Sequence, residues 1–434
     1  MISQKGMIML DFLQQMLENV QLPKVVKIHR KFDNSYVNNI EEILYHQIQS
    51  MQSYQELSPG ARIAIAVGSR GINSINIIVS TVVTLLKSKG AVPFIIPAMG
   101  SHAGATAEGQ RNMLESLGIT ETTIGAPIFS SMEVVTIGML DDGRPIYIDK
   151  LANNADGIII INRIKEHTTF HGIYESGLMK MLTIGLGKQM GAQTYHKTGY
   201  HRMPAIIEQV GKHILNTQPI LFGIAITENA FGKINHLEVL DSMTIPHREI
   251  ELLAMSKSHS PKLGVDQLDV LCVHKIGKDI SGTGMNSNVI GRYNTNDIQV
   301  PQSPSITRIC ILDLTPKTNG SACGMGFGDI ITRKLYEKFS PEQTYPNGLT
   351  STGLKMVKIP MIVESDLRAI QAAIRTALLA DESFVRLAII ENTSNLECFW
   401  VTENVISDIK NIETIESPCA LQFDAQGNLV INYK

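Results

Sequence analysis

The chain has 434 residues, of which 44% are hydrophobic and 18% are charged, a composition typical of a globular protein with two or more domains. Its formal net charge of −3 and its aromatic content of 6% argue against partners such as nucleic acid or an acidic membrane surface. We find no apolar run long enough for a transmembrane helix and no signal peptide, and five cysteines without a C-x-x-C pair favour a reducing cytoplasm.

The first half of the chain alternates between apolar strands and amphipathic helices. The predicted elements are, in chain order, strand 63–67, helix 74–89, strand 92–97, helix 108–117, and strands 157–161 and 219–226. Gly90 and Gly118 stop the two helices, as glycines do at helix C-termini. This alternation predicts an α/β fold with a doubly wound, mostly parallel sheet.

The pattern restarts after a stretch rich in Ser, His, Pro and Gly at 256–265. Strands are predicted at 268–273 and 308–314, and a helix at 364–380. We therefore expect two α/β domains, residues 1–262 and 263–434, with an active-site cleft between them.

Polar residues with useful chemistry follow several of these strands. Ser69 and Arg70 come after the first strand, His102 follows the next, and the stretch from His167 to Lys180 comes after strand 157–161. In open α/β sheets, ligands bind at the carboxyl ends of the strands. A lysine in an apolar turn such as that at Lys180 is costly to bury unless it is paired or covalently used.

Taken singly, these residues leave their roles open, because no G-x-G-x-x-G, P-loop or G-x-S-x-G motif is present. Arg70 could clamp a carboxylate or lie on the surface. His102 could act as a general acid or base or be structural, and the same holds for His167, with His171 as its rival. His196 could be a metal ligand or an ordinary helix histidine. Lys188 and Lys197 are expected to be solvated.

Their combination resembles a known family, the nickel-pincer lactate racemases and their 2-hydroxy-acid racemase and epimerase homologues. The resemblance covers about residues 20–230. It rests on Ser69-Arg70, the Gly100-x-His102-x-x-x-Thr106 element, the His167 loop, the turn Ser176-Gly177-Leu178-Met179-Lys180, and His196.

The resemblance implies a cofactor and a metal. Lys180, in a turn with Ser176 and Gly177, would tether a pyridinium mononucleotide, the nickel-pincer nucleotide, through a thioamide. His196 would complete the coordination of Ni(II), which suits a soft, square-planar site. The cofactor is not expected to be present in protein from every expression host.

The resemblance also implies the reaction, the inversion of C2 of a 2-hydroxy acid by hydride transfer coupled to proton exchange. His102 and His167 would exchange the hydroxyl proton, and Arg70 with Ser69 would hold the substrate carboxylate. The first domain would carry the cofactor and the metal, and the second would contact the substrate, with Lys278 as a candidate. Expected partners are a small 2-hydroxy acid and cofactor-biosynthesis enzymes; an oligomer is possible.

The chain departs from the lactate enzymes in ways that point to another substrate. Val67 stands where those enzymes have aspartate, and Ala103 stands where they have arginine. The gap from His167 to Lys180 is three residues longer, whereas the gap from Lys180 to His196 is unchanged. The polar, Gly-rich loop 278–286 in the second domain suggests a 2-hydroxy acid with a second polar end, rather than lactate.

Two other classes of function stay open. One is a ligand-binding or regulatory homologue that has lost the cofactor. The other is a divalent-metal isomerase or dehydrogenase, for which His167-x-x-x-His171 has the spacing of two ligands on one helix face.

Overall fold

We describe the protein from a computed structural model, which describes residues 12, 15–69, 71–294 and 303–433. The chain divides into two compact units, named here for their place in the sequence. The central unit comprises residues 33–260. The terminal unit comprises residues 261–434 together with the segment that ends at Phe32.

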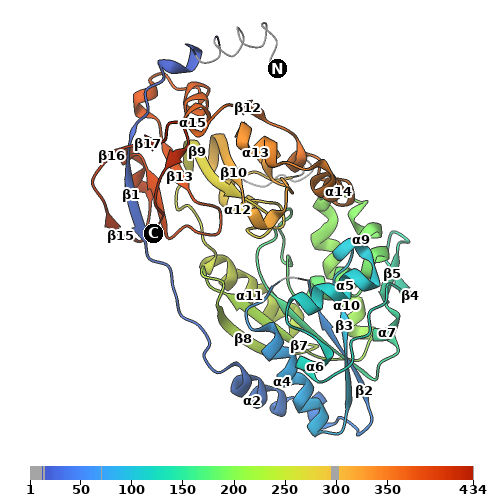
Figure 1. The fold of residues 1–434 in the computed structure, drawn as a ribbon. Coiled ribbons are helices and arrows are strands. Elements are labelled where there is room, and N and C mark those ends of the chain that lie inside the picture. The colour runs from blue at the N-terminus through green and yellow to red at the C-terminus, as the bar shows by residue number, and fades with distance from the viewer. Residues whose placement is uncertain (1–11, 13–14, 70, 295–302, 434) are drawn as a thin grey trace. The chain divides into compact units, whose positions relative to one another are not determined.

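The predicted boundaries, 1–262 and 263–434, put the amino-terminal segment in the first domain. In the structure this segment belongs to the terminal unit instead. Strand β1 (Lys24–Arg30) pairs antiparallel with β14 (Cys398–Val401) and β15 (Ile412–Ile415). Figure 1 shows this strand in blue among the red strands of the carboxyl-terminal part. Its apolar side chains are buried in that sheet, so the chain crosses between the units twice, at 32/33 and at 260/261.

The central unit is built on a five-stranded sheet in the order β3-β2-β6-β7-β8. The first four strands are parallel, and the last pairs antiparallel with its neighbour. The strands are β2 (Arg62–Val67), β3 (Val92–Pro97), β6 (Gly157–Arg163), β7 (Ile220–Glu228) and β8 (Ile234–Asp241). The predicted strands of this region are therefore confirmed, and the carboxyl ends of four of them meet at one edge.

Helices cover both faces of this sheet, as a doubly wound fold requires. Ile63 and Ile65 of β2 pack in one core cluster with side chains of α2 and α4. On the other face, Gly223 of β7 lies against α8 and α11, where an added Cβ would come within 3.1 Å of Ile245. The helices of this unit are α2 (Ile40–Ser50), α3 (Gln52–Gln55), α4 (Ile75–Ser88), α5 (Ala107–Ser116), α6 (Glu121–Ile124), α7 (Lys150–Asn153), α8 (Leu178–Lys180), α9 (Lys188–His196), α10 (Met203–Thr217) and α11 (Ile245–His259).

Shorter elements of the central unit include a hairpin and three tight helical turns. Strands β4 (Val134–Met139) and β5 (Pro145–Asp149) pair antiparallel, apart from the main sheet. The turns are the 3₁₀ helices η1 (Ala103–Ala105) and η3 (Tyr200–Arg202) and the π-helix η2 (Met181–Gly185). Single π-helical turns inside helices are frequent at functional sites.

The terminal unit has a larger mixed sheet in the order β12-β11-β10-β9-β13-β14-β1-β15, with β16 also paired to β1. Its parallel strands are β9 (Gln267–Ile276), β10 (Ser305–Leu314), β11 (Ile330–Thr332), β12 (Met361–Val363) and β13 (Leu387–Ile390). Its remaining elements are α12 (Ser287–Ile290), α13 (Arg333–Lys338), α14 (Pro341–Ser351), α15 (Asp366–Arg375), β16 (Cys419–Ala420), the hairpin β17 (Gln422–Phe423)–β18 (Leu429–Val430), and the 3₁₀ helices η4 (Pro316–Thr318), η5 (Met325–Phe327), η6 (Lys355–Val357), η7 (Glu382–Phe384) and η8 (Glu403–Asp408). The helix predicted at 364–380 is shorter, because the Ser365 side chain caps its start and it ends at Arg375.

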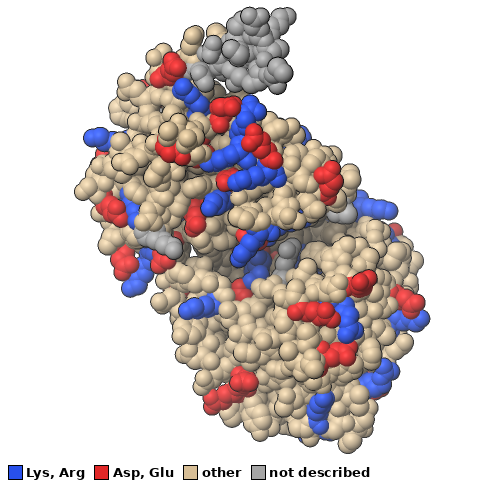
Figure 2. Space-filling view, viewed as in Figure 1, with Lys and Arg blue, Asp and Glu red and all other residues tan. Residues whose placement is uncertain are grey.

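The surface mixes both signs of charge. Figure 2 shows Lys and Arg interspersed with Asp and Glu on the face in view, and pairs such as Arg333–Glu364 lie 2.8 Å apart. All five cysteines are free of disulfide bonds. Within the described ranges, we find no helix that combines the length and the apolar character needed to cross a membrane.

Candidate functional site

Two of the predicted site residues meet where β2 and β3 end. These strands are parallel neighbours, with Val67 opposite Pro97, so the segments that follow them leave the sheet side by side. The Ser69 hydroxyl hydrogen-bonds Nδ1 of His102 there. Arg70, the predicted carboxylate clamp, lies outside the described residues.

Helix α5 hydrogen-bonds to the loop that carries His102. The buried side chain of Gln110 donates to the carbonyl oxygens of Gly100 (2.9 Å) and His102 (3.4 Å). Gly100 has a φ of +59°, and a Cβ there would lie 2.9 Å from the Ile184 side chain. Its N–H donates to the carbonyl of Gly185 in η2 (3.3 Å). A glycine is thus required where this loop meets the segment that follows Lys180.

The second predicted histidine lies in a loop closed on itself. Lys165 and Ser176 form two backbone hydrogen bonds, of 2.9 and 3.2 Å, which bring the ends of the loop together. Glu175 is fully buried inside it. Its carboxylate accepts hydrogen bonds from the backbone N–H of His167 (2.6 Å) and Gly172 (3.4 Å), from His171 Nδ1 (3.2 Å) and from Lys257 Nζ (2.6 Å).

These partners keep Glu175 ionised. Burial alone would raise its pKa, but the hydrogen bonds from His171, Lys257 and the backbone outweigh it and the pKa is lowered. Glu175 therefore acts as a fixed negative charge around which the loop folds.

The hydrogen bonds also distinguish His167 from His171. The N–H of Thr169 donates to Nδ1 of His167 (3.1 Å), so the neutral ring carries its proton on Nε2. Nδ1 of His171 faces the Glu175 carboxylate, so that nitrogen carries the proton and Nε2 is the basic atom. A carboxylate behind a histidine in this way orients the ring and fixes its tautomer. In this conformation His171 is thus better arranged than His167 to accept a proton.

The spacing His167-x-x-x-His171 does not lie on a helix, as expected from Thr168, Thr169 and the following glycine. The described residues between β6 and α8 form no helix, and they are turns and extended chain instead. Nor does any group of three or more His, Cys, Asp or Glu in the described ranges lie close enough to hold a metal ion.

Lys180 lies at the end of α8, directly after the predicted turn of Ser176 and Gly177. Asn162, at the end of β6, donates to the Gly177 carbonyl (2.7 Å) and ties this turn to the sheet. The Glu249 carboxylate, on α11, accepts the N–H of Met179 (2.9 Å). The sheet edge and a second helix therefore both fix the backbone around Lys180.

Lys188 is buried, contrary to the expectation that it is solvated. Its ammonium group lies 2.8 Å from Asp149, which is also fully buried, and donates to the carbonyl of Pro97. Burial lowers the pKa of Lys188, and the charge of Asp149 opposes this effect. Lys197, nine residues on, is exposed as expected.

Lys188 also reverses the direction of the chain. Its φ is +52°, a left-handed conformation that ends a right-handed helix. Lys180 and His196 are sixteen residues apart, and one straight α-helix would separate them by about 24 Å. The turn at Lys188 instead lets α9 bring His196 back toward Lys180.

Aromatic rings join the two ends of this segment. Lys180 Nζ lies 5.5 Å from the centre of the Phe170 ring, and the His167 ring stacks on the same ring at 4.1 Å. Tyr200 lies 6.5 Å from Phe170 and 5.6 Å from His196, between ring centres. We call these five residues the ring cluster. The predicted residues Lys180, His167 and His196 therefore share one site.

His196 is neutral in this setting. Burial, together with the positive charge of Lys180, lowers its pKa to about 4. A neutral imidazole is the form that binds a metal, so the donor fits the role predicted for it.

The ring cluster is linked to the Ser69–His102 pair through backbone contacts. A Cβ on Gly68, the residue before Ser69, would lie 3.4 Å from the side chain of Met181. Met181 directly follows Lys180. Gly100, two residues before His102, is bonded to Gly185. The Ser69–His102 pair thus adjoins the segment that directly follows Lys180.

Lys278 lies in the terminal unit, exposed, in the loop after β9. The loop uses many of its own polar groups. Thr283 donates to the Met285 carbonyl (2.6 Å), the Asn286 side chain accepts from Asn288 N (3.1 Å), and Asp279 accepts from Thr315. The hydroxyls and amides expected to meet a substrate are therefore in part already bonded.

Sequence reasoning missed several residues that shape the site. They are Gln110, Asp149, Phe170, Tyr200 and Glu249. Each acts on a residue distant in sequence or through a ring contact, and no local motif marks such pairs. Phe170 could have been found from its place inside the His167–Lys180 stretch.

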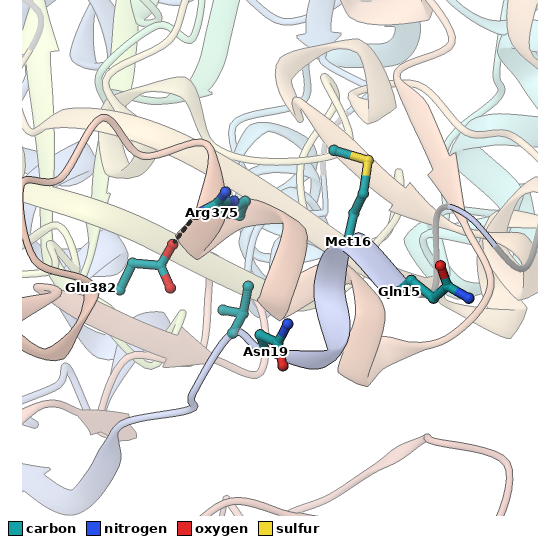
Figure 3. Close-up of a pocket in the computed structure, with 6 residues that line it drawn as sticks. Gln15, Met16, Asn19, Arg375 and Glu382 are labelled. Carbon is teal, nitrogen blue, oxygen red and sulfur yellow. Dashed lines mark hydrogen bonds and ion pairs between the residues drawn. The ribbon is translucent and has the colours of Figure 1, made fainter.

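A surface pocket of the terminal unit is separate from these residues. Figure 3 shows Arg375 paired with Glu382 across it, at 3.2 Å, with Gln15, Met16 and Asn19 from the amino-terminal segment. None of the predicted site residues lines it.

Comparisons with known proteins give one family match, which covers the first part of the chain. Residues 6–205 match the family model of the lactate racemase N-terminal domain. The structure of the lactate racemase apoprotein from Thermoanaerobacterium thermosaccharolyticum is similar at 13% identity and a TM-score of 0.48, covering 85% of this chain and 98% of its own.

A hydrogen sulfide-producing enzyme in complex with an α-aminoacrylate intermediate aligns at 10% identity and a TM-score of 0.15, over 94% of this chain and 98% of its own. No curated protein matches the sequence. The match over residues 6–205 spans the segments that carry Ser69, His102, Lys180 and His196, so this part of the chain is similar to the lactate racemase N-terminal domain.

Proposed function

We propose that the protein is a racemase or epimerase that inverts C2 of a 2-hydroxy acid with a nickel-pincer nucleotide tethered to Lys180. One observation carries the proposal. Lys180 and His196, sixteen residues apart, converge on the ring cluster because the chain reverses at Lys188. A single group attached to the lysine could then reach the histidine.

The donors present fit the cofactor. Lys180 would hold it covalently, Ser176 and Gly177 would shape the turn beside it, and the neutral ring of His196 would bind nickel. When bound, the cofactor supplies a hydride acceptor next to Ni(II). The flat rings of Phe170 and Tyr200 offer apolar surface against which a planar ring can stack.

The chain's own residues would hold the substrate and move its proton. His102, bonded to Ser69, is one proposed acid–base residue. His167 was predicted as the second, but the hydrogen bond between His171 and Glu175 favours His171 as the base. Arg70 is proposed to bind the carboxylate, as a guanidinium does with two parallel hydrogen bonds.

The two histidines can be told apart by substitution. If His171 is the base, His171→Ala should slow conversion in both directions by roughly a hundredfold or more, the usual contribution of a positioned proton-transfer group. His167→Ala should then have a smaller effect. The opposite order would assign the role to His167. Wild-type activity in both variants would exclude the loop from proton transfer.

We propose that the substrate has a second polar or charged end. Lys278, an exposed cation in the polar loop after β9, is the residue proposed for that end, and hydrogen-bonding sites reject analogues that lack their partner more sharply than apolar sites do. A panel of single-enantiomer lactate, malate, 2-hydroxyglutarate and gluconate, given to cofactor-loaded protein, tests this. The highest kcat/KM for lactate would contradict it.

The tether is tested by intact mass after co-expression with cofactor-biosynthesis enzymes, which are the proposed protein partners. We expect an adduct on the wild-type chain and none on Lys180→Arg, because a guanidinium keeps the charge but cannot form the link. Lys197→Arg, which changes an exposed lysine, is the matched control and should keep the adduct. An adduct on Lys180→Arg would place the attachment elsewhere. We propose the cytoplasm as the compartment in which loading occurs.

A further inference from the structure

We propose that Glu249 is a positioning residue for Lys180: its carboxylate fixes the first turn of the helix that carries the lysine. The role that this serves, cofactor attachment, rests on the proposed function, whereas the contact itself does not. Glu249 lies on α11, far from Lys180 in the sequence and outside the matched family domain.

The contact is direct and buried. Glu249 is fully buried, and its Oε2 accepts the N–H of Met179 at 2.9 Å. The Leu178 backbone amide also lowers the pKa of this carboxyl group. The N–H groups at the start of a helix have no partner within the helix, so an external acceptor fixes where the helix begins. Lys180 is the next residue after these two.

Gly177 shows how closely the carboxyl group approaches. A Cβ on Gly177 would lie 2.2 Å from Oε1 of Glu249 and 2.6 Å from its carboxyl carbon. Backbone strain does not explain this glycine, because its φ is 176°. Gly177 and Glu249 are therefore complementary. The turn can pack against α11 only because residue 177 has no side chain.

Stability alone gives no reason for an acid at this place. No cation pairs with Glu249 among the described residues, and its Oε1 has no hydrogen-bond partner there. Burial raises its pKa to about 7, against the effect of the Met179 and Leu178 amides. A methionine of similar size would avoid this cost. The acid does, however, supply an acceptor to the turn that bears Lys180, which methionine cannot.

The test compares three forms of the full chain without cofactor: wild type, Glu249→Gln and Glu249→Met. Each is treated briefly with an N-hydroxysuccinimide ester of acetate, and the acetylation rates of Lys180 and Lys197 are read from peptide masses. Lys197 is exposed and nearby in sequence, so the ratio of the two rates corrects for reagent and pH.

We expect Glu249→Gln to leave the ratio within about twofold, because its amide oxygen still accepts the Met179 N–H. Glu249→Met should raise it roughly fivefold, the factor that corresponds to one lost hydrogen bond, because the loosened turn exposes Lys180. A purely structural acid would give a more stable Met variant with an unchanged ratio, and that result would overturn the proposal.

A second comparison keeps the test decisive if Glu249→Met folds poorly. Gly177→Ala should raise the Lys180 ratio in the wild-type background, since its methyl group displaces the carboxyl group. In Glu249→Ala, where that group is gone, the same change should add nothing further. Equal effects in both backgrounds would rule out the contact. Loss of racemase activity plays no part in either readout, so the proposed function and this inference can fail separately.

Discussion

Two buried carboxyl groups hold the two ends of the stretch from Lys180 to Lys188, and they differ in one respect. Asp149 accepts the N–H groups of Leu151 and Ala152 and pairs with Lys188 at 2.8 Å. Glu249 accepts the N–H of Met179 in α8 and has no cation beside it in the described residues. Both are fully buried.

The presence of a cation decides how each group behaves with pH. Asp149 and Lys188 satisfy each other's charge, which offsets much of the cost of removing both from water. Glu249 has only amide dipoles, and its pKa is raised to about 7. The turn at Lys188 is therefore held by an ion pair, whereas the turn at Lys180 is held by a carboxyl group that titrates near neutrality.

Breaking the ion pair should have the largest effect on stability. Lys188→Met would leave Asp149 buried without its cation, and removal of one partner of a buried pair costs about 3–5 kcal/mol. The left-handed φ at position 188 stays the same for methionine, so the change reports on the pair. The midpoint of urea unfolding measures it.

Lys188→Met with Asp149→Asn is the control for that prediction. Asparagine still accepts the N–H groups of Leu151 and Ala152 but carries no charge. The double variant should recover most of the lost stability. A double variant as unstable as Lys188→Met alone would mean that the lysine acts through its packing rather than its charge.

The unpaired carboxyl group should make stability depend on pH. A folded pKa above the unfolded value means that the folded protein binds the proton more tightly. The stabilisation is then complete below the unfolded pKa, about 4.5, and is lost as pH rises through about 7. For a shift of this size, the loss is roughly 3 kcal/mol.

Glu249→Gln isolates this effect because glutamine does not titrate. Between pH 5 and pH 8, the urea midpoint should fall further for the wild type than for the variant. At pH 8 the variant should be the more stable of the two. Parallel profiles would show that Glu249 stays in one protonation state over this range.

Features that depend on local sequence patterns could be predicted from the sequence. The strands of the central sheet were predicted because uninterrupted apolar runs such as 157–161 have few alternatives. Lys180 and His196 were recognised from a short motif and a fixed spacing. These features are local, and the structure brings both residues to the ring cluster.

What was missed depends on partners that are far apart in the chain. Lys188 was predicted to be solvated, because no local pattern shows that Asp149 lies beneath it. Glu249 sits in a helix with an ordinary mixture of polar and apolar residues, and only its approach to Gly177 distinguishes it. Strand β1 pairs with residues near the other end of the chain.

The middle of the stretch from Lys180 to Lys188 should tolerate substitution better than its two ends. Thr183, in the π-helix η2, donates to the carbonyl of Met179 at 2.9 Å and lies 3.3 Å from that of Ile207. Thr183→Val keeps the shape and removes the hydroxyl, at a cost of about 1 kcal/mol. Thr194→Val removes a similar bond to Met190 on the accessible side of α9 and should cost less. Equal urea midpoints for the two variants would contradict the role of burial.

Lys197→Ala should have the smallest effect. This lysine is exposed at the end of α9, where it gains only a favourable interaction with the helix dipole, so we expect a loss of no more than about 0.5 kcal/mol. Its backbone N–H, which donates to Gln193 at 3.3 Å, is kept in alanine. Lys188 and Lys197 carry the same charge nine residues apart, and the urea midpoints of Lys197→Ala and Lys188→Met compare them directly. A loss at Lys197 as large as that at Lys188 would mean that charge near His196, rather than burial beside Asp149, stabilises this part of the chain.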